Sequence, residues 1–194
     1  MKLCILAGTF NPIHNAHLAM GNFVLEHFDF DKILYIPAFQ PPHKKYDDKL
    51  CEHRFNMVKL AAKNNPHFEV SDIEFCRNEK SYTYKTICEL YEKYSVDGKI
   101  NLIIGTDAFE KIESWYETDK LKDIVDFIVF IRENEKVDFT NLKNKGYNFV
   151  YANMEFIDIS STDIRNNIKN SLPINRFVPK EVEEYIIKNG LYKD

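Results

Sequence analysis

The stretch that decides the fold is Gly8-Thr9-Phe10-Asn11-Pro12-Ile13-His14-Asn15-Ala16-His17, which follows an apolar run at residues 2–7. A helical pattern covers residues 16–28. A glycine between a strand and a helix permits a tight turn, so the segment predicts a strand, a turn and a helix in succession. His17 then falls at the opening of the helix, where backbone N–H groups and the helix dipole favour bound anions.

The same alternation continues along the chain. Runs rich in β-formers predict strands at Lys2–Ala7, Lys32–Pro37, Phe68–Phe75, Ile100–Gly105, Asp126–Arg132 and Tyr147–Ala152. Amphipathic stripes predict crossover helices at Ala16–Phe28 and Arg54–Lys63. Alternation of this kind predicts an α/β fold, a Rossmann-like, mostly parallel sheet with right-handed connections and helices on both faces. Ligands of such sheets bind at the carboxyl ends of the strands.

Two stretches depart from the alternation, residues 38–50 and the polar residues 133–144, and both are expected to be surface loops or excursions. Near the C-terminus, helices are expected at Ser160–Ile168 and Pro179–Lys188, the latter with proline in its first turn and Gly190 beyond its end. A length of 194 residues suits one domain spanning 1–194, in which residues 159–194 hold a polar segment rich in hydroxyl groups and a small helical C-terminal part.

Composition limits the classes of protein that the chain can belong to. A hydrophobic fraction of 44% is that of a globular protein, and a net charge of -4 argues against a general electrostatic grip on nucleic acid. The apolar run at 127–131 is far short of the roughly 20 residues needed to cross a bilayer, and residues 1–8 are too short for a signal-peptide core. We therefore expect a cytoplasmic protein that binds neither nucleic acid nor a membrane.

His14 and His17 form a His-x-x-His pair at the predicted turn. Two imidazoles at this spacing can present ring N–H donors to the oxygens of a triphosphate, although local capping or packing would also explain an isolated pair. Lys44, after Pro41-Pro42-His43, adds a cation on a proline-stiffened loop, or is a solvated lysine. The Gly-x-Gly-x-x-Gly fingerprint is absent, so hydride transfer with a dinucleotide is not indicated.

A second polar segment, Ile159-Ser160-Ser161-Thr162-Asp163-Ile164-Arg165, lies near the C-terminus. Its hydroxyls fall at a predicted helix start, where Ser160 can cap the helix. Arg165, one turn in, can grip a phosphate, although capping alone would explain the hydroxyl cluster.

Both segments resemble motifs of the nucleotidyltransferase superfamily. Its first turn has glycine, Ser/Thr, Phe, Asp/Asn and Pro, then His or Thr two residues before Gly-His. This chain departs from that pattern at Ala7, Asn11 and Ala16, where glycine, aspartate and glycine are usual. Residues 159–165 match the second nucleotide motif, Ile-Ser-Ser-Thr-x-x-Arg, without a departure. Residues 37–44 resemble the matching loop of the bacterial nicotinate mononucleotide adenylyltransferases.

Residues 81–86 and 105–107, with Trp115, resemble the same family. In that family, backbone N–H groups at the position of Thr83-Tyr84 hold the nicotinate carboxylate, and the tryptophan stacks on the pyridine ring. A helix beginning near Thr83 would favour a carboxylate over a neutral carboxamide, and an indole suits a cationic pyridinium. Core packing of Trp115 and helix N-capping by Asp107 are the alternatives.

The resemblance covers nearly the whole chain. It implies adenylyl transfer from ATP to nicotinate mononucleotide in NAD biosynthesis, giving nicotinate adenine dinucleotide and pyrophosphate, with Mg²⁺ held mainly by the ATP phosphates and no metal site on the protein. The implied catalytic residues are His14, His17, Lys44 and Arg165. The implied ATP site contains His14, His17, Arg165, Gly8, Thr9, Phe10, Gly105, Asp107, Ile159, Ser160 and Ser161. The implied site for the mononucleotide contains Asn11, Lys44, Thr83, Tyr84 and Trp115.

Three other interpretations stay open at this point. A related transferase could use phosphopantetheine, against which residues 81–86 and Trp115 argue, or nicotinamide mononucleotide, which is harder to exclude. A nucleotide-binding sensor without turnover would explain Ala7, Asn11 and Ala16, but intact His14, His17 and Arg165 weigh against it. The sequence leaves open whether the chain forms a homo-oligomer.

Overall fold

The computed structural model describes residues 1–42, 48–131, 135–155 and 158–193. Within these ranges, six strands form one sheet in which every neighbouring pair is parallel. The strands are β1 (Leu3–Gly8), β2 (Lys32–Pro37), β3 (Phe68–Val70), β4 (Ile100–Gly105), β5 (Val125–Ile131) and β6 (Phe149–Asn153). Their order, β3-β2-β1-β4-β5-β6, is that of a Rossmann-like doubly wound sheet.

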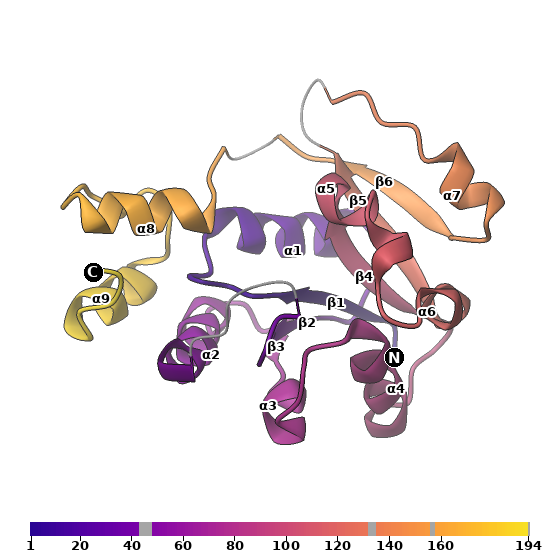
Figure 1. Ribbon diagram of the computed structural model, residues 1–194, viewed down its shortest axis with the longest axis horizontal. Coiled ribbons are helices and arrows are strands. Elements are labelled where there is room, and N and C mark those ends of the chain that lie inside the picture. Colours follow the sequence, from indigo (N-terminus) through magenta and orange to yellow (C-terminus); the bar gives the residue numbers. More distant parts are fainter. Residues whose placement is uncertain (43–47, 132–134, 156–157, 194) are drawn as a thin grey trace.

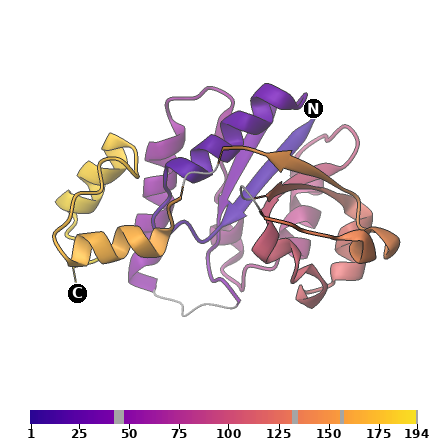
Figure 2. The same ribbon diagram turned by 90° about the horizontal axis from the view of Figure 1, so that it is seen from above.

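Helices connect the strands and extend the chain at its C-terminal part. Over the described residues they are α1 (Asn15–His27), α2 (Asp48–Ala62), α3 (Ile73–Arg77), α4 (Thr83–Lys93), α5 (Thr106–Phe109), the 3₁₀ helix η1 (Ile112–Ser114), α6 (Thr118–Ile124), α7 (Thr140–Asn144), α8 (Ser161–Lys169) and α9 (Lys180–Lys188). In the views of Figures 1 and 2, α8 and α9 lie at one end of the long axis and α6 and α7 at the other.

Successive side chains of each strand point to opposite faces of the sheet, and each face has its own core. Cys4 and Leu6 of β1 belong to a core that also contains residues of α1, α2, α8 and α9. Leu3 and Ile5 belong to the other core, which contains residues of α3 to α7. Burial on both faces explains why the four central strands, β2, β1, β4 and β5, are nearly continuous apolar runs.

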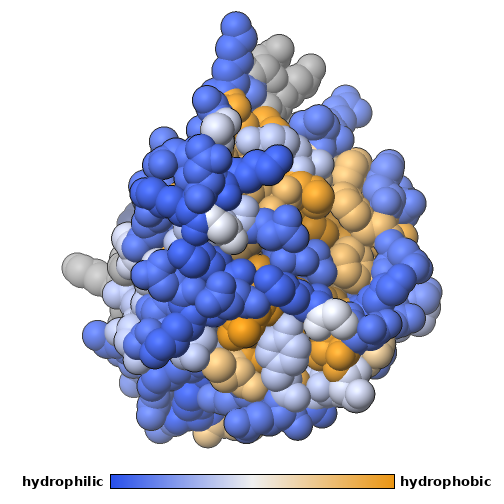
Figure 3. Space-filling model, turned by 90° about the vertical axis from the view of Figure 1, so that its right-hand side faces the viewer, coloured by the Kyte–Doolittle hydropathy of each residue, from blue (hydrophilic) through white to orange (hydrophobic). Residues whose placement is uncertain are grey.

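The surface at the α6 and α7 end is mostly hydrophilic, with apolar side chains showing in the gaps between polar ones (Figure 3). Val150 and Tyr151 of the edge strand β6 are among the exposed large hydrophobic residues, at 48% and 42%. No helix in the described part of the chain is long and apolar enough to span a membrane.

The predicted fold class is confirmed, but the strand predicted at Phe68–Phe75 is wrong after Val70, because α3 begins at Ile73. Phe68 and Val70 are two residues apart, as the apolar residues of a strand are. The next apolar residue, Ile73, is three residues after Val70, which breaks the period of a strand. Asp72 occupies the N-cap of α3, and Glu74 lies in its first turn, where negative charge is favoured.

Two other boundaries also differ from prediction. Helix α2 begins at Asp48, within the stretch expected to be a loop. The polar stretch 133–144 includes α7, which buries Leu142 in the second core. One buried leucine anchors a short helix that has too few apolar residues for a recognisable stripe.

Candidate active site

The topology places the turn after β1 at the point where the order of the strands in the sheet reverses. The chain runs from β1 outward through β2 and β3, then returns to β4 on the other side of β1. Strand β1 pairs with β2 as far as Gly8, but its ladder with β4 consists of Cys4 with Asn101 and Ile5 with Leu102. Open α/β sheets bind their ligands outside the carboxyl ends of the strands at such a switch point.

The turn itself is tightly packed. Phe10 is 2% exposed and has a positive φ of 48°. A Cβ atom on Gly8 would lie 3.1 Å from the Phe10 ring, so a larger residue would displace that ring. The rings of Phe10 and His17 also form a T-shaped pair, with 5.0 Å between their centroids. Gly8 and Phe10 therefore fix the backbone that leads into α1.

His14 and His17 lie together at the start of α1, as the His-x-x-His spacing predicted. Their rings stack with centroids 3.7 Å apart. The backbone N–H of His14, the N-cap residue, donates to Nδ1 of His17 at 3.3 Å. Because Nδ1 of His17 accepts this bond, the neutral ring carries its proton on Nε2. This tautomer makes Nε2 of His17 a hydrogen-bond donor.

Burial changes the charge state of His14. Its side chain is 6% exposed in the free protein, and burial lowers its pKa from 6.5 to about 4. His14 is therefore neutral near pH 7 and supplies a ring N–H donor rather than a net charge. Its Nδ1 atom has no hydrogen-bond partner among the described residues.

The second nucleotide motif docks on the first through backbone carbonyl groups. Ser161 Oγ donates to the carbonyl of Pro12 at 2.9 Å, and Arg165 Nη1 donates to the carbonyl of Asn11 at 2.8 Å. Ser160 accepts from the backbone N–H of Asp163 at 3.1 Å, so its predicted capping role is confirmed. Two segments about 150 residues apart in the sequence thus meet at one turn.

Tyr192 adds a contact that sequence reasoning missed. Its hydroxyl donates to Asn11 Oδ1 at 2.7 Å, and burial raises the pKa of the phenol well above its usual value. The side chain of Asn11 is therefore held by the C-terminal part of the chain. The sequence offers no local signal for this bond, because 181 residues separate its partners.

Arg54 of α2 is a second missed residue. It is 3% exposed, and its guanidinium donates to the carbonyls of Thr9 and Ala38 at 2.7 and 2.6 Å. It thereby joins the turn after β1 to the loop after β2. Its position gives a usable signal, since buried Cys51 and Val58 lie three residues before and four after it on the same helix.

The carboxyl end of β4 carries Gly105 and Asp107. A Cβ atom on Gly105 would meet no described atom within 4 Å, which leaves room beside this strand end. Gly105 is the N-cap of α5, so N-capping by Asp107 is ruled out. Asp107 is exposed on the first turn of α5.

Residues predicted to hold the nicotinate ring come together from two elements. Helix α4 begins at Thr83, as predicted, with Tyr82 as its N-cap. Trp115 is half-buried at the end of η1 and packs against the second core rather than being enclosed in it. The ring centroids of Tyr82 and Tyr116 lie 4.6 Å apart. This contact brings the residue before Thr83 close to the residue after Trp115.

Two predictions have a different standing. Lys44 lies outside the described residues. No group of three or more His, Cys, Asp or Glu side chains in the described ranges could hold a metal ion.

Comparison with known proteins identifies this arrangement. Residues 5–167 match the model of the family described as cytidylyltransferase-like, so fold and site define a nucleotidyltransferase. A Caldicellulosiruptor saccharolyticus protein named probable nicotinate-nucleotide adenylyltransferase is 39% identical, and the alignment covers 100% of both chains. The chain belongs to the nicotinate-nucleotide adenylyltransferase family and is an enzyme of this type.

Solved structures agree with this assignment. The chain resembles Plasmodium falciparum nicotinic acid mononucleotide adenylyltransferase complexed with NaAD, with a TM-score of 0.80 and 26% identity, covering 98% of this chain and 97% of that one. The same plasmodial enzyme complexed with APC gives a TM-score of 0.75 at 25% identity, covering 98% and 96% of the two chains.

Proposed function

We propose that the site transfers the adenylyl group of ATP to nicotinate mononucleotide, giving nicotinate adenine dinucleotide and pyrophosphate in NAD biosynthesis. The observation that carries the proposal is the docking of α8 on the turn after β1. The bonds from Arg165 to Asn11 and from Ser161 to Pro12 bring the two nucleotide motifs into one site. The NaAD complex of the similar plasmodial enzyme supports the same reaction.

In this reaction a 5′-phosphate oxygen of the mononucleotide attacks the α-phosphorus of ATP in line. A new P–O bond forms there as the bond from the α-phosphorus to the oxygen bridging to the β-phosphate breaks, and pyrophosphate leaves. The attacking oxygen is already ionised, so the reaction needs no protein base or nucleophile. The enzyme must instead bring two polyanions together and stabilise charge on the equatorial and leaving oxygens.

The described residues can supply that stabilisation. His17 offers Nε2–H, and His14 adds a second imidazole beside it. Arg165 brings a permanent positive charge from α8, and the N-termini of α1 and α8 both lie at the turn after β1. The family resemblance implies that Lys44 adds a further cation for the phosphates. Mg²⁺, arriving bound to ATP, would neutralise phosphate charge.

The acceptor site favours an acid over an amide. Backbone N–H groups at the start of α4, around Thr83 and Tyr84, would donate to the nicotinate carboxylate. The half-buried indole of Trp115 offers a face for the cationic pyridinium. A neutral carboxamide gains less from a helix N-terminus, so nicotinamide mononucleotide should be the poorer acceptor. A cytoplasmic location fits a reaction that consumes ATP and stays a prediction.

The test measures pyrophosphate release with ATP and Mg²⁺, and compares nicotinate mononucleotide, nicotinamide mononucleotide and phosphopantetheine as acceptors. We expect the acid to give the highest kcat/KM. Preference for either other acceptor would overturn the substrate assignment. Nucleotide binding without pyrophosphate release for any acceptor would mean that the chain is a sensor.

A further inference from the structure

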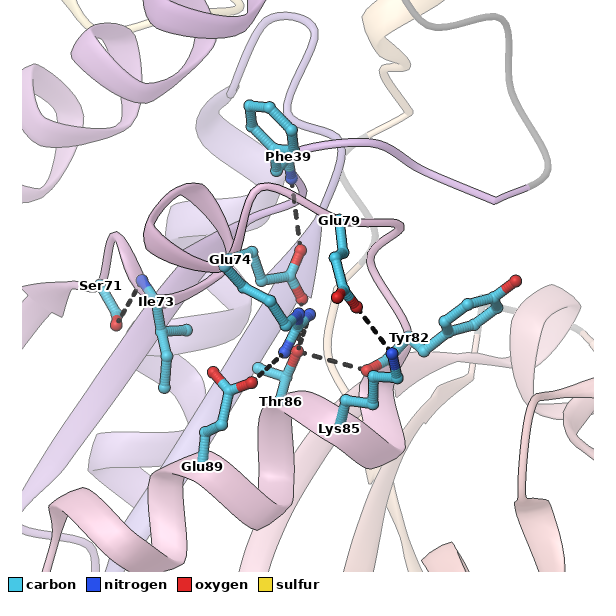
Figure 4. Close-up of polar contacts among 10 residues, drawn as sticks. Phe39, Ser71, Ile73, Glu74, Glu79, Tyr82, Lys85, Thr86 and Glu89 are labelled. Atoms are coloured by element: carbon cyan, nitrogen blue, oxygen red, sulfur yellow. Dashed lines mark hydrogen bonds and ion pairs between the residues drawn. The ribbon is translucent and has the colours of Figure 1, made fainter.

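A buried carboxylate links two segments of the proposed acceptor site. Glu74 of α3 is 3% exposed. Its Oε2 accepts from the backbone N–H of Phe39 at 3.3 Å, and its Oε1 accepts from Thr86 Oγ1 at 2.7 Å. Figure 4 shows the carboxylate between the loop after β2 and the first turns of α4. Glu74 therefore contacts both segments without being part of either.

The hydroxyl of Thr86 can donate only one proton. Its contact with Glu74, at 2.7 Å, is shorter than its contact with the carbonyl of Tyr82, at 3.3 Å. Arg77 Nη2 donates to the same oxygen at 3.1 Å, which occupies one of its lone pairs. The Thr86 proton is thus directed to Oε1 of Glu74 rather than to the carbonyl of Tyr82.

A second link runs beside the first. The backbone N–H of Gln40 donates to Ser81 Oγ at 3.1 Å, and the N–H of Ser81 donates to the carbonyl of Gln40 at 2.9 Å. The loop after β2 is therefore fastened at Phe39 and Gln40 to the region where α4 begins. Of these hydrogen-bonded links, the one through Glu74 reaches a residue within α4, whereas Ser81 precedes the helix.

We infer that Glu74 is a positioning residue that sets the N-terminus of α4 for the nicotinate carboxylate and so maintains the preference for the acid. The inference rests on the proposed function. Thr86 follows Thr83, Tyr84 and Lys85, the first residues of α4, whose N–H groups have no partner further back in the helix. Anchoring Thr86 fixes the direction of those N–H groups, and a carboxylate binds well only to donors that are correctly aligned.

Glu74→Gln tests the inference, because it preserves size but replaces one acceptor oxygen with an NH₂ donor. That donor must face either the N–H of Phe39 or the hydroxyl of Thr86, so one of the two links is lost or reversed. We expect KM for nicotinate mononucleotide to rise roughly tenfold or more, while KM for ATP stays within about twofold. The ratio of kcat/KM for the acid to that for nicotinamide mononucleotide should fall by a similar factor.

Glu89→Gln is the matched control. Glu89 is a carboxylate of the same network and pairs with Arg77 Nη1 at 2.8 Å, but no described bond joins it to the loop after β2. This variant should keep the wild-type KM for both substrates. Equal losses in the two variants would show that the network serves only general stability and would overturn the inference.

A second pair of variants covers the case in which Glu74→Gln does not fold. Thr86→Val removes the hydroxyl and keeps the shape, whereas Thr86→Ser keeps the hydroxyl. Thr86→Val should reproduce the rise in KM for nicotinate mononucleotide. Thr86→Ser should have the wild-type KM. Wild-type kinetics in folded Glu74→Gln or Thr86→Val would refute the positioning role of Glu74 and leave the proposed function intact. If the wild-type enzyme does not use nicotinate mononucleotide, both the proposed function and the positioning role are refuted.

Discussion

His14 is neutral because the fold buries it at the start of α1, and this burial ties the stability of the protein to pH. The unfolded chain binds a proton at this histidine below its ordinary pKa of 6.5, whereas the folded chain binds one only near a pKa of about 4. The contribution of His14 to the free energy of unfolding is therefore fully present above pH 6.5. This contribution is lost as the pH falls toward 4.

This dependence predicts a difference between wild type and His14→Asn. Between pH 7 and pH 5, the free energy of unfolding of the wild type should fall by about 2 kcal/mol more than that of the variant. Urea unfolding at the two pH values measures the difference. His67→Asn, which removes an exposed histidine, should keep the wild-type dependence. An identical pH dependence in wild type and His14→Asn would contradict the burial argument.

Arg165 uses the fork of its guanidinium, because Nη1 holds the carbonyl of Asn11 and Nη2 contacts Thr162 Oγ1 at 3.2 Å. We expect Arg165→Ala to lower kcat/KM for ATP roughly a hundredfold, because a charge-assisted contact to an ATP phosphate is lost both in the bound state and in the transition state. Arg165→Lys should remain far below wild type, since a single ammonium group cannot hold the turn and a phosphate together.

Steady-state kinetics against ATP checks this prediction. Lys169→Ala, which removes an exposed cation from the same helix, is the control and should behave as wild type. Recovery of full turnover in Arg165→Lys would show that a point charge is sufficient and would refute the role of the fork.

The residues that sequence reasoning identified are those whose local context defines their role. Ser160 was predictable as a cap because its partner, Asp163, is three residues away. Arg54 and Glu74 were not predicted, because their partners are backbone groups on the loop after β2 and a hydroxyl on α4, which only the tertiary fold brings near. The partners of a buried charged group are set by the tertiary fold. The local pattern can therefore indicate that Arg54 is buried, but it cannot report which groups Arg54 or Glu74 contacts.

Longer helices and clear apolar strands were predicted more accurately than short helices. Five of the six predicted strands lie within two residues of those observed. Four of them, β1, β2, β4 and β5, are mostly buried and are therefore distinct apolar runs. The short helices α5, α6 and η1 were not predicted. Elements of three to seven residues carry too few periodic positions to separate a helix from a loop.

Helix α4 permits a test of its backbone donors. Proline is tolerated at the first position of a helix, and the backbone of Tyr82, at φ −94° and ψ 119°, suits a residue that precedes proline. Thr83→Pro therefore removes one N–H group without breaking the helix. We expect KM for nicotinate mononucleotide to rise about tenfold, with KM for ATP unchanged.

Kinetics with both substrates and circular dichroism together check the effect of Thr83→Pro. Thr83→Ser keeps the N–H and is the control. If Thr83→Pro has wild-type KM for the acid and a normal spectrum, the N–H of Thr83 does not bind the carboxylate.

At the scale of the whole molecule, the site depends on contacts between distant parts of the chain. The parallel order of the sheet places the ends of β1 and β4 side by side, which follows from the alternation of strands and helices. The docking of α8 on Asn11 and Pro12 does not follow from that alternation, and only the motif resemblance pointed to it. A phosphate bound between α1 and α8 would therefore join the C-terminal helices to the sheet.

This arrangement predicts how ligands stabilise the protein. Because Mg²⁺ is expected to arrive on the ATP phosphates, Mg²⁺ alone should leave Tm unchanged, whereas an ATP analogue with Mg²⁺ at about one hundred times Kd should raise Tm by roughly 5 to 10 °C. Thermal scans with neither ligand, each ligand and both ligands measure these shifts. Arg165→Ala should lose most of the shift at the same ligand concentration. A rise of the same size with Mg²⁺ alone would mean that the protein itself holds a metal ion and would overturn the view that the nucleotide carries it.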